Sequence, residues 1–346
     1  MKDFGYTVVK QIIKKCLYGY FGEIKIVGAE HIPENGPVFF VANHQNALLD
    51  ALLIATHQKR NPYYLARADV FKKPLIKKLL TFFHMMPVYR IRDGKSTLAN
   101  NHAIFDACGD LLLKHESILI FPEGNHGLRR RVRPLSKGFT RIIFDALKKN
   151  PTLDIQLVPI GVNYNAATEF PDGAAIYFGP AVSVQNIVHG ISELEAAQKL
   201  KNLTFLELTR LTTHISSLEE YDNVHAKLLT HTPDFLNPVE TNKLLQTLAD
   251  SSVKTEKLKG KAKVNMAKIA VKLLNFPSVL IWKYGLKGMH PDIEFASTLR
   301  FASSIIGSVL WYSILTIVVS AFIGVVWVLP VLVFQIVLSK FCMRYI

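Results

Sequence analysis

The sequence predicts an α/β protein: a layered domain with a mostly parallel sheet flanked by helices, followed by a helical C-terminal region with a membrane hairpin. Two observations predict this fold class. Between residues 36 and 164, short apolar runs rich in β-branched and aromatic residues alternate with segments of helical periodicity, as in strand–helix–strand units. After about residue 190 the pattern is helical, and residues 301–339 are 39 residues without one Asp, Glu, Lys or Arg.

The individual elements follow from local patterns of apolar residues and turn residues. The expected strands lie within residues 36–43, 61–66, 85–90, 117–124 and 155–164. The expected helices lie within residues 46–59, 71–83, 96–114 and 136–149.

Composition excludes some classes of protein and leaves others open. Hydrophobic residues make up 49% of the 346 residues, which excludes a disordered chain. The three cysteines, Cys16, Cys108 and Cys342, are too far apart for a CxxC motif and too few for a disulfide scaffold. The net charge of +14 fits a nucleic acid, an anionic membrane or an anionic substrate as partner.

The position of the apolar residues favours a membrane. A membrane helix needs about 20 apolar residues, so the charge-free run 301–339 is nearly twice one span, and Gly324 and Pro330 interrupt it. We expect two spans; one long buried helix and a re-entrant segment are the alternatives. Because Arg300 and Lys340 flank the run, the positive-inside rule places both ends, and the domain before them, on the cytoplasmic side.

Basic residues are concentrated next to this run. Residues 251–300 hold ten Lys or Arg and three Asp or Glu, a cluster that attracts anionic lipid. No pattern of a nucleic-acid-binding module occurs, so we expect no nucleic acid partner.

The N-terminus is predicted to be an amphipathic helix, packed on its own domain or on a membrane surface, and not a cleaved signal peptide. Its apolar residues recur every four positions: Phe4, Val8, Ile12, Cys16 and Tyr20. The predicted organisation is an amphipathic helix (1–22), an α/β domain (23–235), a helical basic juxtamembrane region (236–300) and the membrane segment (301–339).

One candidate for catalysis is a histidine with an aspartate six residues later, His44 and Asp50, where an expected strand ends and a helix begins. An imidazole acts as a general base near neutral pH when a carboxylate on its other nitrogen fixes its orientation. Six residues within one helix would separate the two side chains. The pair therefore requires His44 on the preceding turn, with Asp50 reaching back from the helix.

Three further motifs follow at other strand ends. The first is Val88-Tyr89-Arg90-Ile91-Arg92, the second is Phe121-Pro122-Glu123-Gly124 with a run of arginines after it, and the third is Leu157-Val158-Pro159-Ile160-Gly161-Val162. Sites of α/β sheets lie at such strand ends, and arginine binds phosphate through forked hydrogen bonds.

The order of the four motifs, NHQNALLD, MMPVYRIRD, FPEGNHG and LVPIGV, resembles the phospholipid/glycerol acyltransferase family, which includes lysophosphatidic acid and glycerol-3-phosphate acyltransferases. The resemblance covers about residues 20–215. It implies an acyltransferase-type domain that transfers a fatty acyl group from acyl-CoA or acyl carrier protein to 1-acylglycerol-3-phosphate, giving phosphatidic acid. It implies no cofactor besides this thioester, and no metal.

The resemblance also implies roles for individual residues. His44 would be the general base, and Asp50 would orient it. The residues expected to bind substrate are Asn43, Arg90, Arg92, Glu123, Gly124, Arg129, Arg130, Arg131, Lys137 and Pro159.

Two departures from the family pattern leave alternatives open. Five residues separate His44 from Asp50 instead of four, as in some acyltransferases that use glycerol-3-phosphate or dihydroxyacetone-phosphate. Asn125-His126 follows the FPEG block where the family has an arginine; one of the other basic residues would replace it. A non-catalytic lipid-binding membrane protein on the same fold is the alternative from another class.

Overall fold

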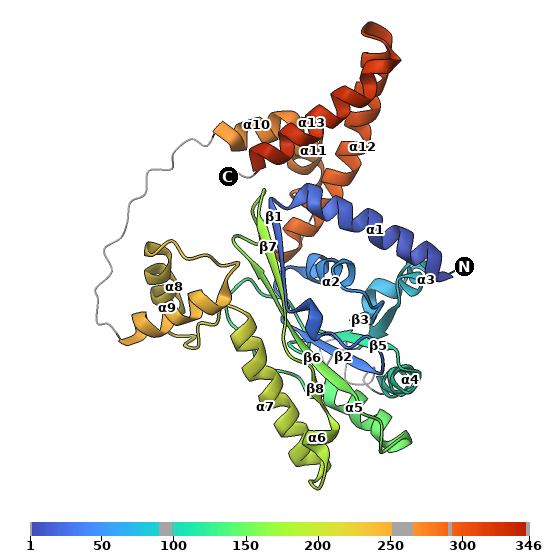
Figure 1. Cartoon of the computed structure of the whole chain (residues 1–346), viewed down its shortest axis with the longest axis vertical. Coiled ribbons are helices and arrows are strands. Elements are labelled where there is room, and N and C mark those ends of the chain that lie inside the picture. The colour runs from blue at the N-terminus through green and yellow to red at the C-terminus, as the bar shows by residue number, and fades with distance from the viewer. Residues whose placement is uncertain (1, 90–98, 100, 251–265, 290–292, 344–346) are drawn as a thin grey trace.

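The computed structural model describes residues 2–89, 99, 101–250, 266–289 and 293–343. An eight-stranded sheet lies at the centre of this part of the chain (Figure 1). The strands are β1 (Glu23–Val27), β2 (Val38–Ala42), β3 (Tyr63–Arg67), β4 (Met85–Val88), β5 (Ser117–Ile120), β6 (Gln156–Tyr164), β7 (Gly173–Phe178) and β8 (Val182–Ser183).

The sheet is mostly parallel, as predicted. Its order is β1-β7-β6-β2-β5-β3-β4, with β8 paired to β6. The five strands from β6 to β4 run in one direction, whereas β7 and β8 are antiparallel to β6 and β1 is parallel to β7. All five expected strands are confirmed. Strands β1, β7 and β8 were not predicted from the sequence, because they are short or lie outside the repeated strand–helix pattern.

The helices of the described residues are α1 (Lys2–Tyr20), α2 (Ala47–Thr56), α3 (Pro74–Phe82), α4 (Asn101–Leu113), α5 (Gly138–Lys149), α6 (Gln185–Val188), α7 (Glu193–Leu211), α8 (Tyr221–Thr230), α9 (Pro238–Asp250), α10 (Met266–Leu274), α11 (Phe276–Leu280), α12 (Ala296–Phe322) and α13 (Val328–Met343). The four helices expected between residues 46 and 149 are confirmed as α2 to α5.

Both faces of the sheet are buried, which explains why β2 is apolar throughout. Its residues Val38 and Phe40 point into a core formed with α1 and α2, whereas Phe39 and Val41 point into a second core formed with α4, α5 and α7. All four side chains have no exposed surface. The N-terminal end of α12 joins the first core through Phe301.

The C-terminal helices form a hairpin that rises away from the sheet (Figure 1). Residues 293–322 and 325–343 are each long and apolar enough to cross a membrane, and only 11% of the apolar window of each is buried inside the molecule. The turn between them contains Gly324, whose φ of +108° favours glycine. This break and the exposed apolar surface exclude one long buried helix and fit a two-span hairpin.

Helix α1 has two different sides. Leu17 and Tyr20 are buried in the core, whereas Phe4 and Ile12 remain 76% and 55% exposed. Its C-terminal end is held by the hairpin, because Lys340 Nζ of α13 donates hydrogen bonds to the carbonyl oxygens of Tyr18, Phe21 and Gly22 at 2.6–3.0 Å. The helix thus packs on its own domain and still presents an apolar outer side.

Candidate active site

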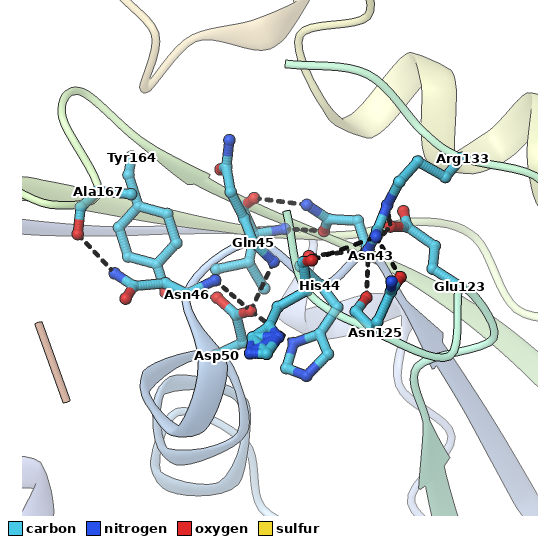
Figure 2. A network of polar contacts seen from close by, with 12 residues as sticks. Asn43, His44, Gln45, Asn46, Asp50, Glu123, Asn125, Arg133, Tyr164 and Ala167 are labelled. Atoms are coloured by element: carbon cyan, nitrogen blue, oxygen red, sulfur yellow. Dashed lines mark hydrogen bonds and ion pairs between the residues drawn. The ribbon is translucent and has the colours of Figure 1, made fainter. Parts of the chain in front are cut away.

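The site lies at the carboxyl edge of the parallel strands. The chain leaves β2 through Asn43 and His44 and enters α2, and it leaves β5 through Phe121 and Glu123. Because β2, β5 and β6 are parallel, these two loops and Tyr164, the last residue of β6, meet at one edge (Figure 2).

His44 and Asp50 form a hydrogen-bonded pair. His44 Nδ1 lies 2.8 Å from Asp50 Oδ2. Asp50 lies in the first turn of α2 and His44 on the turn before it, which is the arrangement that the six-residue separation requires. Asp50 itself has no exposed surface.

The carboxylate of Asp50 is held by three further donors. Its Oδ2 accepts the backbone N–H groups of Gln45 and Asn46, both at 2.8 Å, and its Oδ1 accepts the hydroxyl of Tyr164 at 2.6 Å. These bonds fix the carboxylate against the His44 ring. Tyr164 was not among the residues predicted for the site; its position at the end of a predicted strand was the available signal.

The imidazole of His44 is partly open to solvent, with 19% of its side chain exposed. It stacks on the Phe121 ring, with centroids 4.1 Å apart, and faces the His126 ring at 5.5 Å. Burial, with the neighbouring His44, lowers the pKa of His126, so that ring stays neutral at neutral pH. Since Nδ1 of His44 contacts Asp50, Nε2 is the nitrogen left for a substrate.

Glu123 and Arg133 form a second polar pair beside His44 (Figure 2). Arg133 Nε donates to Glu123 Oε2 at 2.6 Å, and its guanidinium also bonds Asn125 and the carbonyl oxygens of His126 and His44, at 3.2 and 3.4 Å. Only 2% of the Glu123 side chain is exposed. Burial raises the pKa of Glu123, and the Arg133 guanidinium opposes that shift.

Arg133 thus connects the Phe121–Gly124 loop to the turn that carries His44. It belongs to the arginine run but was not among the expected site residues. Arg133 meets Glu123 because the loop after β5 folds back on itself. The separation of ten residues in the sequence does not predict this contact.

The arginines before it have separate environments. Arg129 is exposed and lies over the Tyr221 ring. Arg130 donates to the carbonyl oxygens of Tyr164 and Asn165, and its guanidinium lies 3.3 Å from the Phe235 ring centroid. Burial lowers the pKa of Arg130 to about 10, so it remains charged at neutral pH.

A narrow pocket that is open to solvent joins these groups. It is lined by Asn43, His44, Gln45, Glu123, Gly127, Arg129, Arg130, Arg131, Val132, Val162, Asn163, Thr212 and Thr213. With Glu123 paired to Arg133, the arginines give the pocket an excess of positive charge.

The structure brings Asn43, His44, Asp50, Glu123 and the three arginines together, whereas Pro159, Lys137 and Gly124 do not line the pocket. The Asn43 side-chain amide accepts a hydrogen bond from the Val162 N–H at 2.7 Å and donates one to the Val162 carbonyl at 3.0 Å. It thereby joins the end of β2 to β6. Pro159 is buried within β6, Lys137 is exposed at the start of α5, and Gly124 is an exposed turn residue with φ +76°. Arg90 and Arg92 lie outside the described residues.

Comparisons with known proteins agree with the motifs. Residues 23–163 match the protein family described as Acyltransferase. The chain is 20% identical over 267 residues to glycerol-3-phosphate O-acyltransferase 1 of Saccharomyces cerevisiae, covering 53% of this chain and 35% of that protein. It is 25% identical over 138 residues to a chloroplastic 1-acyl-sn-glycerol-3-phosphate acyltransferase of Brassica napus, covering 40% and 38%.

A solved structure is also similar. The 1-acyl-sn-glycerophosphate acyltransferase PlsC of Thermotoga maritima is 17% identical, with a TM-score of 0.41, covering 63% of this chain and 85% of that one. The chain spans less than two fifths of the length of the two curated relatives above. The family match identifies residues 23–163 as an acyltransferase domain.

Proposed function

We propose that this chain is a membrane-bound O-acyltransferase that transfers a fatty acyl group from acyl-CoA or acyl carrier protein to 1-acylglycerol-3-phosphate, giving phosphatidic acid. The observation that carries the proposal is the His44–Asp50 pair, 2.8 Å apart, beside a pocket lined by three arginines.

In the proposed reaction His44 Nε2 takes the proton of the acceptor hydroxyl as its oxygen attacks the thioester carbonyl. The tetrahedral intermediate then collapses, its carbon–sulfur bond breaks, and the leaving thiolate receives the proton from His44. Asp50 holds the ring in the orientation that presents Nε2 and stabilises the imidazolium between the two steps. No acyl-enzyme is formed in this scheme.

The arginine-lined pocket supports a phosphate-bearing acceptor. Glycerol-3-phosphate or dihydroxyacetone-phosphate is the second candidate, favoured by the five-residue spacer between His44 and Asp50 and by the yeast relative. For the hairpin and the basic residues before it, we propose an anionic membrane as partner, with the acyltransferase domain on its cytoplasmic side.

The test supplies membranes containing the protein with radiolabelled acyl-CoA and, in separate tubes, glycerol-3-phosphate and 1-acylglycerol-3-phosphate. His44→Ala serves as the inactive variant, and His189→Ala, an exposed histidine after α6, is the matched control. We expect label in phosphatidic acid from the lysolipid tube, lost in His44→Ala and kept in His189→Ala.

The other outcomes decide between the alternatives. Label in lysophosphatidic acid from the glycerol-3-phosphate tube would assign the first acylation step. Transfer retained in His44→Ala would contradict the mechanism. No transfer to any acceptor, with acyl carrier protein tested as donor as well, would favour a non-catalytic lipid-binding protein.

A further inference from the structure

The connection between α7 and α8 contributes to the catalytic pocket, although it lies outside the matched family segment 23–163. Thr212 and Thr213 of this connection line the same pocket as His44. Two hydrogen bonds join it to the arginine loop: Ile215 N–H donates to the Arg130 carbonyl at 2.9 Å, and Val132 N–H donates to His214 Nδ1 at 3.0 Å.

The connection is also fixed to the sheet. A Cβ at Gly161 of β6 would lie 2.1 Å from the carbonyl oxygen of Leu211, so the close approach of the two backbones requires glycine there. Asn163 Nδ2 donates to the same carbonyl at 2.9 Å, and Asn242 Nδ2 of α9 donates to the Thr212 carbonyl at 2.9 Å. Thr213 is therefore held in place beside the pocket.

Two polar atoms in this pocket are buried without a hydrogen-bond partner among the described residues: Thr213 Oγ1 and Arg131 Nε. Thr213 is only 4% exposed. The adjacent Thr212 hydroxyl, in contrast, donates to the Leu208 carbonyl at 2.7 Å. Buried polar groups in native proteins are almost always satisfied. Because both residues also line the pocket beside His44, this pair can donate to a ligand that accepts hydrogen bonds.

The neighbouring arginines are already engaged. Arg130 is bonded to two carbonyl oxygens and stacked on Phe235, and Arg133 is paired with Glu123. Arg129 is exposed over Tyr221. Arg131 is thus the arginine of the pocket with a buried donor that the fold itself does not use.

We propose that Arg131 and Thr213 form the subsite for the phosphate ester of the acceptor, with Arg131 Nε and the Thr213 hydroxyl donating to phosphate oxygens. This inference rests on the proposed function and assigns the residues that select a phosphate-bearing acceptor. In a glycerol phosphate the reacting hydroxyl and the phosphate belong to one three-carbon unit, so a phosphate bound by this pair would lie close to the hydroxyl that reaches His44. The phosphates of acyl-CoA are separated from its thioester by the whole pantetheine arm.

The test replaces Thr213 with valine, which keeps the shape of the side chain and removes the hydroxyl. Thr204→Val is the matched control, because its hydroxyl is also buried and unpartnered but lies on α7 and is not among the residues that line the pocket. A hydrogen bond to a charged group corresponds to a factor of at least about ten in binding. We expect Thr213→Val to raise the KM for 1-acylglycerol-3-phosphate or glycerol-3-phosphate by about tenfold, with unchanged kcat and unchanged KM for acyl-CoA.

Two further variants keep the result interpretable. Thr213→Ser retains the hydroxyl and should restore the low KM, which separates the subsite from a folding defect. Arg131→Lys keeps the charge without Nε and should also raise the acceptor KM. With 1-acylglycerol, which has no phosphate, Thr213→Val and the wild type should have the same KM.

Binding of inorganic phosphate to the His44→Ala protein, measured by calorimetry, tests the subsite apart from turnover. If the protein transfers no acyl group at all, the proposed function fails, and this measurement with and without Thr213→Val still decides the subsite. Equal phosphate affinity in the two proteins would overturn the inference. A raised KM for acyl-CoA instead of the acceptor would also overturn it, because the phosphate bound would then be that of the donor.

Discussion

The Asp50 carboxylate shows how a charge is kept in the core of this protein. It has no exposed surface, yet its two oxygens receive four hydrogen bonds, from His44, Tyr164 and the backbone of Gln45 and Asn46. Burying a carboxylate is unfavourable unless such donors replace water. The same bonds that permit burial also fix the orientation of His44.

Tyr164→Phe tests how much one of these four hydrogen bonds contributes to stability and to the orientation of His44. We expect the free energy of unfolding to fall by about 1–3 kcal/mol, because Asp50 loses a buried hydrogen bond to its charge. We expect kcat to fall less than in Asp50→Asn, since the oxygen that faces His44 keeps its backbone donors. Thermal unfolding in detergent and steady-state kinetics measure both.

Tyr177→Phe is the control for that variant. Its hydroxyl is also buried but donates to a neutral group, the Leu236 carbonyl, at 2.9 Å. Its loss should therefore cost less, about 1 kcal/mol. Equal stability losses in the two variants would contradict the special role of the Asp50 contact.

Two buried titratable side chains make stability depend on pH in opposite directions. Burial lowers the pKa of His57 to about 4. Between pH 6.5 and 4 the unfolded chain binds a proton there and the folded chain does not, so stability falls as the pH falls, by at most about 3 kcal/mol. Burial raises the pKa of Asp172 to about 6, so between pH 6 and 4 its proton uptake favours the folded state.

The pH dependence of the unfolding temperature in detergent checks both signs. We expect His57→Gln to reduce the loss of stability between pH 7 and 4.5, and Asp172→Asn to increase it. Asp172→Asn keeps an acceptor for the backbone N–H groups of Ala166 and Gly173, so fold damage is small. If each variant changed the unfolding temperature by the same amount at every pH, His57 and Asp172 would not be the source of the pH dependence.

At the scale of elements, an ion pair links the loop after β5 to the turn that carries His44. Arg133 links Glu123 to the backbone of the His44 turn, and Gly127 N–H also donates to the His44 carbonyl, at 3.1 Å. Two loops from neighbouring parallel strands are thereby joined into one unit. The position of His44 thus depends on both loops.

Arg133→Gln should lower the free energy of unfolding by about 3–5 kcal/mol, because it leaves the Glu123 carboxylate buried without its partner. The second substitution, Glu123→Gln, should recover part of that loss. The control is Arg210→Gln in the exposed α7 pair with Glu207, where we expect less than about 1 kcal/mol. Equal losses at the two arginines, measured by thermal unfolding, would show that the loop pair contributes no more than a surface pair.

At the scale of the whole molecule, the C-terminal hairpin and the acyltransferase domain are directly connected. Ser297 and Arg300 of α12 donate to the carbonyl oxygens of Ala167 and Thr168, at 2.5 and 2.8 Å. Asn46, next to the catalytic turn, donates to the same Ala167 carbonyl at 3.1 Å. The hairpin therefore supports the domain through direct contacts, besides its proposed role as a membrane anchor.

A truncation after residue 250 separates these two roles. We expect alkaline carbonate to release this fragment from membranes but not the full chain, because α12 and α13 are absent. We also expect the fragment to unfold at a lower temperature, since Phe301 no longer covers Tyr20 and the core around it. A fragment that stays in the membrane pellet would assign much of the binding to α1, whose outer side is apolar.

Much of the fold follows from the sequence because the signals are local. Five strands, four helices and the mostly parallel sheet are predicted from alternating apolar runs, and the hairpin from a charge-free run interrupted at Gly324. The edge strand β1 and its neighbour β7 were missed because their pairing is not encoded in a local period. Where these two strands lie depends on pairing with strands that are distant in the sequence: β1 pairs with β7, and β7 pairs with β6.

The sequence by itself predicted the acyltransferase domain and the His44–Asp50 pair, because the motif order and the six-residue separation are properties of the chain. Only the tertiary structure decided the rest of the site. Tyr164 reaches Asp50 from 114 positions away, and Thr213 reaches the arginine loop from a segment without a motif. Hydrogen bonds between strand ends depend on which loops the sheet brings together, and sheet order is set by packing of the whole domain.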